Sequence, residues 1–302
     1  RIHRKAAQET GLKEGTPVIV GGADTQLGLV GIGLTEPGQF TILGGTFWQQ
    51  TIGVAQPLID PEGRLRTLCH SLPGQWMLEG IGFYSGLTMR WFRDAFCQLE
   101  LEQAKALQQD PYTLMEQEAM LAPPGSNGVM GIFSNIMNAR RWIHASPGLL
   151  QFDITNPFSS GKKECIRAIE ESAAYVSYGH MQIIESLTSR TFDEIVFAGG
   201  AARGQLWPQI LADVLNCRVK VPVVKESTAL GAALYAGLGA GIYDDVQSAA
   251  RSIVAFEKVF EPDPATHQRY LVLYEQWLRV YQRSLDMVEA GLVRPLWRAA
   301  GT

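Results

Sequence analysis

The sequence predicts an α/β fold, because segments of strand character alternate with segments of helical periodicity. The alternation is clearest in the second half of the chain, which contains a strand over 194–198, a helix over 205–215, a strand over 218–224 and a helix rich in glycine and alanine from Ala229. A long amphipathic helix over 165–187 precedes them and provides an apolar face that can cover a sheet.

The first half of the chain has the same character, with shorter elements. A helix ends at Gly11, and a buried strand is expected over the apolar run 16–21. The turn 44–46, with two glycines between apolar runs, predicts a β hairpin over 39–54. The pattern over 85–96 becomes helical.

Two helices carry apolar stripes at steps of three and four residues. The stripe of the long helix consists of Ile166, Ile169, Ala173, Val176, His180, Ile183 and Leu187. Because it lies within that stripe, His180 is interpreted as a packed histidine and not as a ligand. The tail helix has a face formed by Tyr270, Tyr274, Trp277, Tyr281, Leu285 and Val288. If the chain contains a boundary between two structural units, we expect it in the loop 151–161.

The composition excludes several classes of protein. The chain has 302 residues, of which 46% are apolar and 19% charged, and this composition argues against disorder. Its 26 basic and 30 acidic residues give a net charge of −4, so a basic nucleic-acid footprint is absent. No uncharged stretch suits a membrane span, and the four cysteines form no CxxC pair. We expect a cytoplasmic protein with reduced thiols and without nucleic-acid or membrane partners, while a homodimer stays open.

Familiar catalytic motifs are missing from the sequence. It contains no GxxxxGK[ST] loop, no GxGxxG, no HExxH and no GxSxG elbow. His144 and Ser146 are neighbours, but they lack the context of a nucleophile elbow. A hydrolase mechanism is therefore disfavoured.

Junctions between strands and glycines are what remains. The segment 197–204 leaves a strand through two glycines and enters a helix whose N-terminal N–H groups could face an anion. Asp24 follows a predicted strand, where a carboxylate can face a ligand crevice, and Gly45 and Thr46 offer free backbone and a hydroxyl for a phosphate. Each feature alone has a structural alternative, as a tight turn, a helix cap or a hairpin turn.

The order of these features along the chain resembles the C-terminal half of the FGGY carbohydrate kinases. The segments that carry the resemblance are GGADTQLGLVGIG (21–33), LGGTFWQQ (43–50), SGLTMRWFRDAF (85–96), FAGGAARGQLWPQILADV (197–214) and ESTALGAALYAGLGAG (226–241). The resemblance implies a ribonuclease H-like fold of the actin/hexokinase ATPase type. It also implies phosphorylation of a hydroxyl on a small sugar-like substrate, with ATP and Mg²⁺ as cofactors.

The resemblance assigns roles on the substrate side of the site. Asp24 matches the catalytic base of the family, which accepts the proton of the attacking hydroxyl. Thr25 and Gln26 lie beside it in the sequence and are expected to contact substrate. Trp48, together with Phe47, is expected to wall the sugar side, with a place in the hairpin core as the alternative.

The resemblance also assigns a nucleotide site. Arg90 stands where some relatives carry glutamine and could pair with a phosphate, and Gly204 stands where some relatives carry an asparagine that contacts adenine. The complete set of expected nucleotide-binding residues is Gly45, Thr46, Gly86, Arg90, Gly200, Ala201 and Gly204.

The family's N-terminal domain has no counterpart in the sequence. Members of the family carry an Asp-x-Gly-Thr/Ser loop there that holds Mg²⁺ and phosphates, and no such tetrapeptide occurs in these 302 residues. We expect residues 1–15 to be the end of that preceding domain and residues 16–302 to be the C-terminal domain. No metal ligand is assigned in this chain, and by itself it is expected to have negligible kinase activity.

Two other functions stay open. The same fold type serves regulators, so a nucleotide-sensing module without catalysis is one alternative. The other is a scaffold domain that packs through its tyrosine-rich tail helix. Asp24 separates the kinase from the sensor, because a sensor does not need a base at that position.

Overall fold

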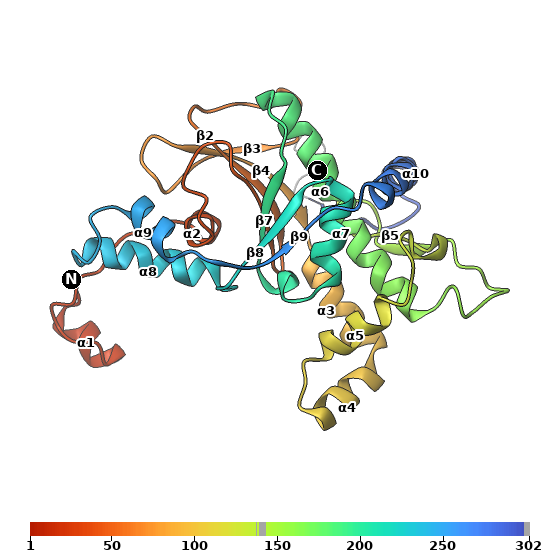
Figure 1. Ribbon diagram of the computed structural model, residues 1–302, viewed down its shortest axis with the longest axis horizontal. Coiled ribbons are helices and arrows are strands. Elements are labelled where there is room, and N and C mark those ends of the chain that lie inside the picture. Colours follow the sequence, from red (N-terminus) through yellow and green to blue (C-terminus); the bar gives the residue numbers. More distant parts are fainter. Residues whose placement is uncertain (137, 139–142, 299–302) are drawn as a thin grey trace.

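A seven-stranded sheet forms the centre of the protein (Figure 1). The computed structural model describes residues 1–136, 138 and 143–298. The strands lie in the order β3-β4-β2-β1-β7-β8-β9. Their bounds are β1 Phe40–Gly44, β2 Trp48–Val54, β3 Arg66–Cys69, β4 Trp76–Phe83, β7 Glu194–Ala198, β8 Arg218–Pro222 and β9 Phe256–Phe260. A two-stranded sheet is formed by β5 (Met130–Ile132) and β6 (Gly148–Leu150).

Helices cover both faces of the large sheet, so the predicted α/β class is confirmed (Figure 1). One face packs against α6 (Lys162–Thr188), and the other against α2 (Asp24–Gly31), which in turn packs against α8 (Ser227–Gly239). The other helices are α1 Arg4–Thr10, α3 Ser85–Phe96, α4 Gln98–Leu107, α5 Pro111–Ala119, α7 Leu206–Leu215, α9 Val246–Ile253 and α10 Pro264–Glu289, with short 3₁₀ turns at Ser126–Gly128 and Gly200–Arg203.

The middle of the sheet combines two kinds of strand pairing. The predicted hairpin is confirmed, because β1 pairs antiparallel with β2 from Phe40↔Ile52 to Gly44↔Trp48. On its other side β1 pairs parallel with β7, in the register Leu43↔Ala198. The carboxyl ends of β1 and β7 therefore lie side by side, the position at which open α/β sheets bind ligands.

The long helix α6 is buried over most of its length, as its stripe predicts. His180 is fully buried, and burial lowers the pKa of its imidazole to about 3, so the ring is neutral. It packs against the backbone of β4 at Gly80, where any side chain would collide with the ring. The interpretation of His180 as a packed histidine is confirmed.

The tail helix α10 buries its aromatic face inside this chain. Tyr270, Tyr274, Trp277 and Tyr281 are each at most 7% exposed. The hydroxyl of Tyr270 lies 2.8 Å from Oε1 of Glu171 on α6 and accepts a hydrogen bond from Arg167. The stripe expected on this helix is confirmed. Because the core uses it, the stripe is not available as a docking face for a scaffold.

One predicted strand is wrong. Residues 16–21 form no strand, and among the described residues no strand of either sheet pairs with them. Val18 and Val20 are 60% and 94% exposed. A run of apolar, β-branched residues favours extended backbone and burial against another element, but it does not specify which strand it pairs with. The edges of the large sheet are already formed by β3 and β9. Asp24 consequently begins a helix and does not end a strand.

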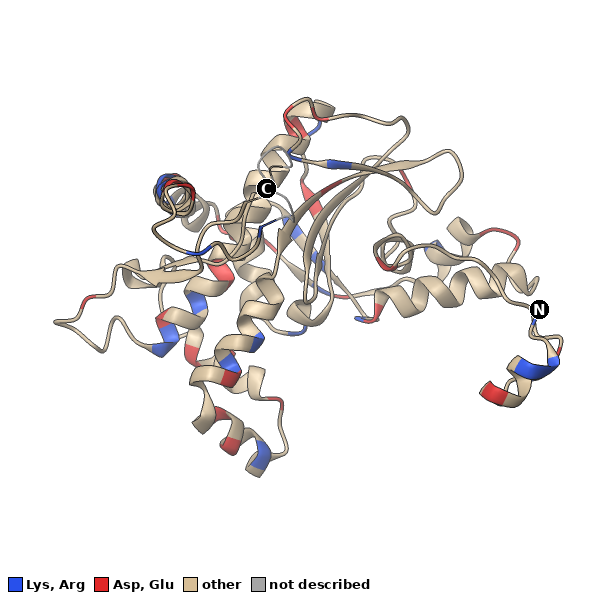
Figure 2. Ribbon diagram, turned by 180° about the vertical axis from the view of Figure 1, so that it is seen from behind, with Lys and Arg blue, Asp and Glu red and all other residues tan. Residues whose placement is uncertain are grey.

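Charges are distributed unevenly over the helices. In Figure 2 acidic and basic residues are interspersed on the helices below the sheet, whereas α8 carries no charge in its sequence STALGAALYAGLG. The loop 151–161 joins β6 to α6 and is largely exposed. Within the part of the chain that the structure describes, no helix is both long and apolar enough to cross a membrane.

Replacing the buried His144 with Phe is expected to reduce acid destabilisation. Its ring packs edge-on against Phe83 and near Trp297, and burial lowers its pKa to about 4. The unfolded chain binds a proton near pH 6.5 and the folded chain only near pH 4, so stability is complete above pH 6.5 and falls by about 1.4 kcal/mol per pH unit across that window.

Phe keeps the aromatic contacts and does not titrate. Between pH 7 and pH 5 we expect the variant to lose about 2 kcal/mol less unfolding free energy than the wild type, measured by urea denaturation. His3→Asn, at an exposed helix cap, is the control and should follow the wild-type slope. Equal slopes for His144→Phe and the wild type would contradict the prediction.

Candidate active site

Three loops meet where the parallel strands β1 and β7 end. The turn after β1 lies against the start of α3, because any Cβ at Gly86 would overlap the carbonyl oxygen of Gly45. The loop after β7 is equally close, since a Cβ at Gly199 would lie 2.5 Å from the carbonyl oxygen of Gly44. Gly199 also has a φ of 98°, which glycine adopts without strain. Backbone contact at both positions explains why glycine is needed there.

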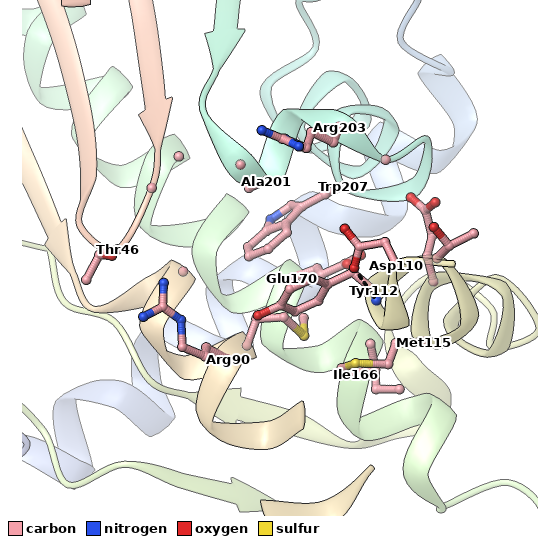
Figure 3. Close-up of a pocket in the computed structure, with 18 residues that line it drawn as sticks. Thr46, Arg90, Asp110, Tyr112, Met115, Ile166, Glu170, Ala201, Arg203 and Trp207 are labelled. Carbon is pink, nitrogen blue, oxygen red and sulfur yellow. Dashed lines mark hydrogen bonds between the residues drawn. The ribbon is translucent and has the colours of Figure 1, made fainter. Parts of the chain in front are cut away.

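These loops border a cavity of about 490 Å³ (Figure 3). Its size is within the range of small-molecule sites. Helices α5, α6 and α7 complete the walls with Tyr112, Met115, Ile166 and Trp207. The lining includes all the residues expected at a nucleotide site, namely Gly45, Thr46, Gly86, Arg90, Gly200, Ala201 and Gly204.

The cavity has two electrostatically different ends. At one end the guanidinium of Arg90 on α3 points toward the loop that carries Thr46 (Figure 3). Burial raises the pKa of the neighbouring Tyr112 hydroxyl, and the positive charges of Arg93 and Arg90 partly counter the shift. Three carboxyl groups, those of Asp110, Glu116 and Glu170, line the rest of the cavity, together with Arg203, which pairs with Glu226.

The N-terminus of α7 is already occupied, which corrects one expectation. Oε1 of Glu116 accepts hydrogen bonds from the backbone N–H groups of Gln205 at 2.5 Å and Leu206 at 2.7 Å. A Cβ at Gly204 would overlap the same carboxylate oxygen. The helix N-terminus that we expected to face an anion therefore binds a side chain from α5 instead. Glu116 is more than 80 residues distant in sequence, so no local pattern could have shown this.

Asp24 lies outside the cavity lining, at the first turn of α2, and its side chain is exposed. Its Oδ1 accepts a hydrogen bond from the backbone of Thr25 at 2.7 Å, and its carbonyl oxygen accepts one from Thr228 at 3.1 Å. Helix α8 positions α2 through direct backbone contact, because a Cβ at Gly31 or Gly231 would overlap a carbonyl oxygen of the other helix.

Polar side chains surround Asp24 on the adjoining face of the sheet. Glu79 on β4 is fully buried and pairs with Arg66. Burial raises the pKa of Glu79, Arg66 counteracts this, and the nearby charge of Asp24 raises it further. Nε2 of Gln49 donates a hydrogen bond to Oγ1 of Thr25 at 2.6 Å. This face can present hydroxyl and amide groups to a polar ligand beside Asp24.

The residues expected to contact substrate have different positions. Trp48 is fully buried, with its indole N–H 2.9 Å from Oγ of Ser177 and its ring stacked on Trp207, so of its two expected positions it occupies the hairpin core. Strand alternation turns Trp48 into the core and leaves Phe47 at the turn 47% exposed. Gln26 bonds through both ends of its amide to backbone, at the N–H of Ala23 and the carbonyl of Cys69.

The described residues contain no group of three or more His, Cys, Asp or Glu side chains that could hold a metal ion. In this part of the chain Cys69 is exposed, the other three cysteines are buried, and none is in a disulfide. Sequence inspection did not identify Glu116, Glu170 or Trp207 as lining residues. The sequence offered one signal for such a residue, because the acidic Glu170 follows Ile166 of the apolar stripe by one helical turn.

The fold and the glycine-bordered cavity define the class of protein. Residues 50–240 match the FGGY family of carbohydrate kinases, C-terminal domain, and the chain belongs to this family. It is a domain of a phosphotransferase. It is 46% identical over 300 residues to autoinducer-2 kinase of Escherichia coli (strain K12) and 45% identical to autoinducer-2 kinase of Klebsiella pneumoniae. Each match covers 99% of this chain and 56% of the relative, so the chain spans about half the length of the relatives it matches.

Solved structures show the same fold. Xylulose kinase from Rhodospirillum rubrum superposes with a TM-score of 0.76 at 23% identity, over 95% of this chain and 55% of that one. Gluconate kinase from Lactobacillus acidophilus superposes with a TM-score of 0.73 at 18% identity, over 93% of this chain and 54% of that one. The expected actin-like ATPase fold is confirmed.

Proposed function

We propose that this chain provides the nucleotide cavity and the catalytic base for ATP-dependent phosphorylation of a hydroxyl on autoinducer-2, the open-chain dihydroxypentanedione. The observation that carries the proposal is the cavity at the ends of β1 and β7, which gathers all the expected nucleotide-binding residues from three separate segments. The identity of 46% to autoinducer-2 kinase supports the choice of substrate.

The cavity suits a nucleotide on its own geometry. Close backbone contacts at Gly86 and Gly199 hold the loops together, and glycines 45, 86 and 200 leave this end of the cavity without side chains at those positions. Thr46 and Arg90 provide a hydroxyl and a cation at the same end. When bound, ATP supplies the phosphoryl group that is transferred. We propose that Mg²⁺ arrives with the nucleotide, and that the remaining phosphate and metal contacts come from residues in the part of the relatives that this chain does not cover.

Asp24 is the proposed base in this reaction. Its carboxylate accepts the proton of the substrate hydroxyl as that oxygen attacks phosphorus, and Arg90 and the backbone of the 44–46 turn stabilise negative charge on the phosphates. The hydrogen bonds of Asp24 to Thr25 and Thr228 hold the first turn of α2 in place, so the base is preorganised.

Two other functions are kept as alternatives. A pentulose kinase of the xylulokinase type would use the same base and cavity, and the solved xylulose kinase shares the fold. A nucleotide sensor without catalysis would use the cavity alone. Turnover on a pentulose would distinguish the pentulose kinase from the proposed function. A requirement for Asp24 would distinguish the proposed kinase from the sensor.

The test is ADP release by a hybrid in which this chain replaces the matching 300 residues of the E. coli autoinducer-2 kinase. Dihydroxypentanedione, xylulose, ribulose and glycerol are the acceptors, and the 302-residue chain is assayed alone in parallel. We expect turnover by the hybrid on dihydroxypentanedione and negligible turnover by the chain alone. Turnover on a pentulose would keep the mechanism and replace the substrate. A hybrid that binds ATP and turns over no acceptor would favour the sensor.

A further inference from the structure

The half-buried side chain of Gln49 connects the sheet to the helix that carries the proposed base. Its Nε2 donates a hydrogen bond to Oγ1 of Thr25 at 2.6 Å, and Thr25 is only 7% exposed. Gln49 belongs to β2, whereas Thr25 is the second residue of α2 and directly follows Asp24. The bond therefore joins the strand to the first turn of α2, beside the base.

Gln49 also belongs to the hairpin that carries the proposed phosphate turn. It follows Thr46 by three positions, on the strand that leaves the 44–46 turn. Its neighbour Trp48 binds Ser177 of α6 on the opposite face of the sheet. The register of β2 against β4 shifts between Trp48 and Gln49, and such bulges often re-aim a side chain beside an active site. The hairpin is thus anchored to α6 by one residue and to α2 by the next.

The hydroxyl group of Thr25 connects Gln49 to the carboxylate of Asp24. The backbone N–H of Thr25 donates to Oδ1 of Asp24 at 2.7 Å, and the Thr25 hydroxyl lies 3.5 Å from the same oxygen. A hydroxyl group accepts at its oxygen and donates through its single hydrogen. Since Gln49 donates to the oxygen, the hydrogen is left for the carboxylate. Gln49 therefore acts on the orientation of Asp24 through Thr25.

Other bonds hold the backbone of the same helical turn. The amide of Gln26 binds backbone groups at both of its ends, at 2.8 and 2.7 Å, and Thr228 donates to the carbonyl oxygen of Asp24 at 3.1 Å. These contacts engage main-chain atoms and do not depend on Gln49. Loss of the Gln49 amide should consequently disturb the orientation of the base and leave α2 folded.

We propose that Gln49 is a positioning residue for phosphoryl transfer, which sets the Asp24 carboxylate relative to the 44–46 turn through the hydroxyl of Thr25. The inference rests on the proposed function and adds to it the link between base and phosphate turn. As the acceptor oxygen bonds to the γ-phosphorus, the bond from phosphorus to ADP breaks and the hydroxyl proton passes to Asp24. The base and the phosphates must therefore keep a fixed separation, and the link from β2 provides it without contacting substrate.

The first test measures ADP release by the hybrid kinase with Gln49→Met, Thr25→Val and both substitutions together. Methionine keeps the length of glutamine and valine keeps the shape of threonine, but neither forms the bond. We expect each to lower kcat about tenfold, less than the ~10²-fold cost of a 1 Å misplacement, with KM for the acceptor within about twofold. The double variant should also lose only about tenfold, because both substitutions remove the same bond. Thr25→Ser keeps the hydroxyl and should keep the activity.

A second comparison asks whether the effect depends on the base. In the Asp24→Asn hybrid, Gln49→Met should leave the residual kcat within about twofold, because no base is left to position. A further tenfold loss in that background would overturn the inference, and so would multiplied losses in the double variant. A raised KM at unchanged kcat would overturn it by making Gln49 a substrate contact. Full turnover by Asp24→Asn alone would instead overturn the proposed base.

Hydrogen exchange of the 302-residue chain tests the link without turnover. In Gln49→Met we expect the backbone N–H groups of residues 24–27 to exchange about tenfold faster, because the first turn of α2 opens more often. Gln103→Met, on the exposed surface of α4, is the matched control and should leave both exchange and kcat unchanged. Wild-type exchange rates in Gln49→Met would overturn the inference and leave the proposed function intact.

Discussion

Replacing Asp24 with Asn in the hybrid kinase is expected to lower kcat by about 10³-fold, the middle of the range for loss of a general base. Asparagine keeps the size of the side chain but does not accept the substrate proton. ATP affinity should stay within about twofold, because Asp24 does not line the nucleotide cavity, and a twofold change corresponds to only about 0.4 kcal/mol. ADP release gives kcat, and calorimetric titration gives the affinity.

A surface aspartate provides the control for this substitution. Asp244 is exposed in the loop between α8 and α9, and Asp244→Asn should leave both quantities unchanged. Loss of turnover and of ATP affinity together in Asp24→Asn would indicate a structural role at the start of α2. Full turnover in the variant would place the base elsewhere and favour the sensor.

Replacing Gly231 with Ala should destabilise the protein by about 3 kcal/mol, near the top of the usual range for overpacking. The added methyl group would overlap the carbonyl oxygen of Leu27, a backbone atom that cannot turn away as a side chain can. Helix α2 must then separate from α8, which also moves Asp24 at its first turn. We expect a lower urea midpoint with an unchanged m-value, together with a lower kcat.

A second glycine shows whether the effect comes from helix contact. Gly148 has open space around its Cβ position and a backbone that other residues can adopt, so Gly148→Ala should change stability by less than about 0.5 kcal/mol. A Gly231→Ala protein with the wild-type urea midpoint would show that α2 and α8 separate without cost, and would remove the basis for the positioning of Asp24.

Local patterns were sufficient for most of the secondary structure. The stripe of α6, the hairpin β1–β2 and the strand β7 depend on residues within a few positions of one another, and the structure confirms each. The prediction of a strand over 16–21 was wrong because apolar character indicates burial but does not specify a pairing partner. For Trp48 the sequence left two positions open, because a tryptophan beside a loop and a tryptophan in a core have the same local sequence, and the structure shows the core position.

The candidate site was likewise predictable from the sequence only in part. The glycines of the site, at 45, 86, 199 and 200, were recognisable from the sequence. At Gly86 and Gly199 the structure supplies the reason, because a Cβ there would overlap the backbone of a neighbouring loop. Packing alone brought Glu116 to the start of α7 and Glu170 and Trp207 to one cavity. Those contacts join α5, α6 and α7 across long stretches of chain, and a contact between distant residues depends on how the helices pack on the sheet, which no local pattern encodes.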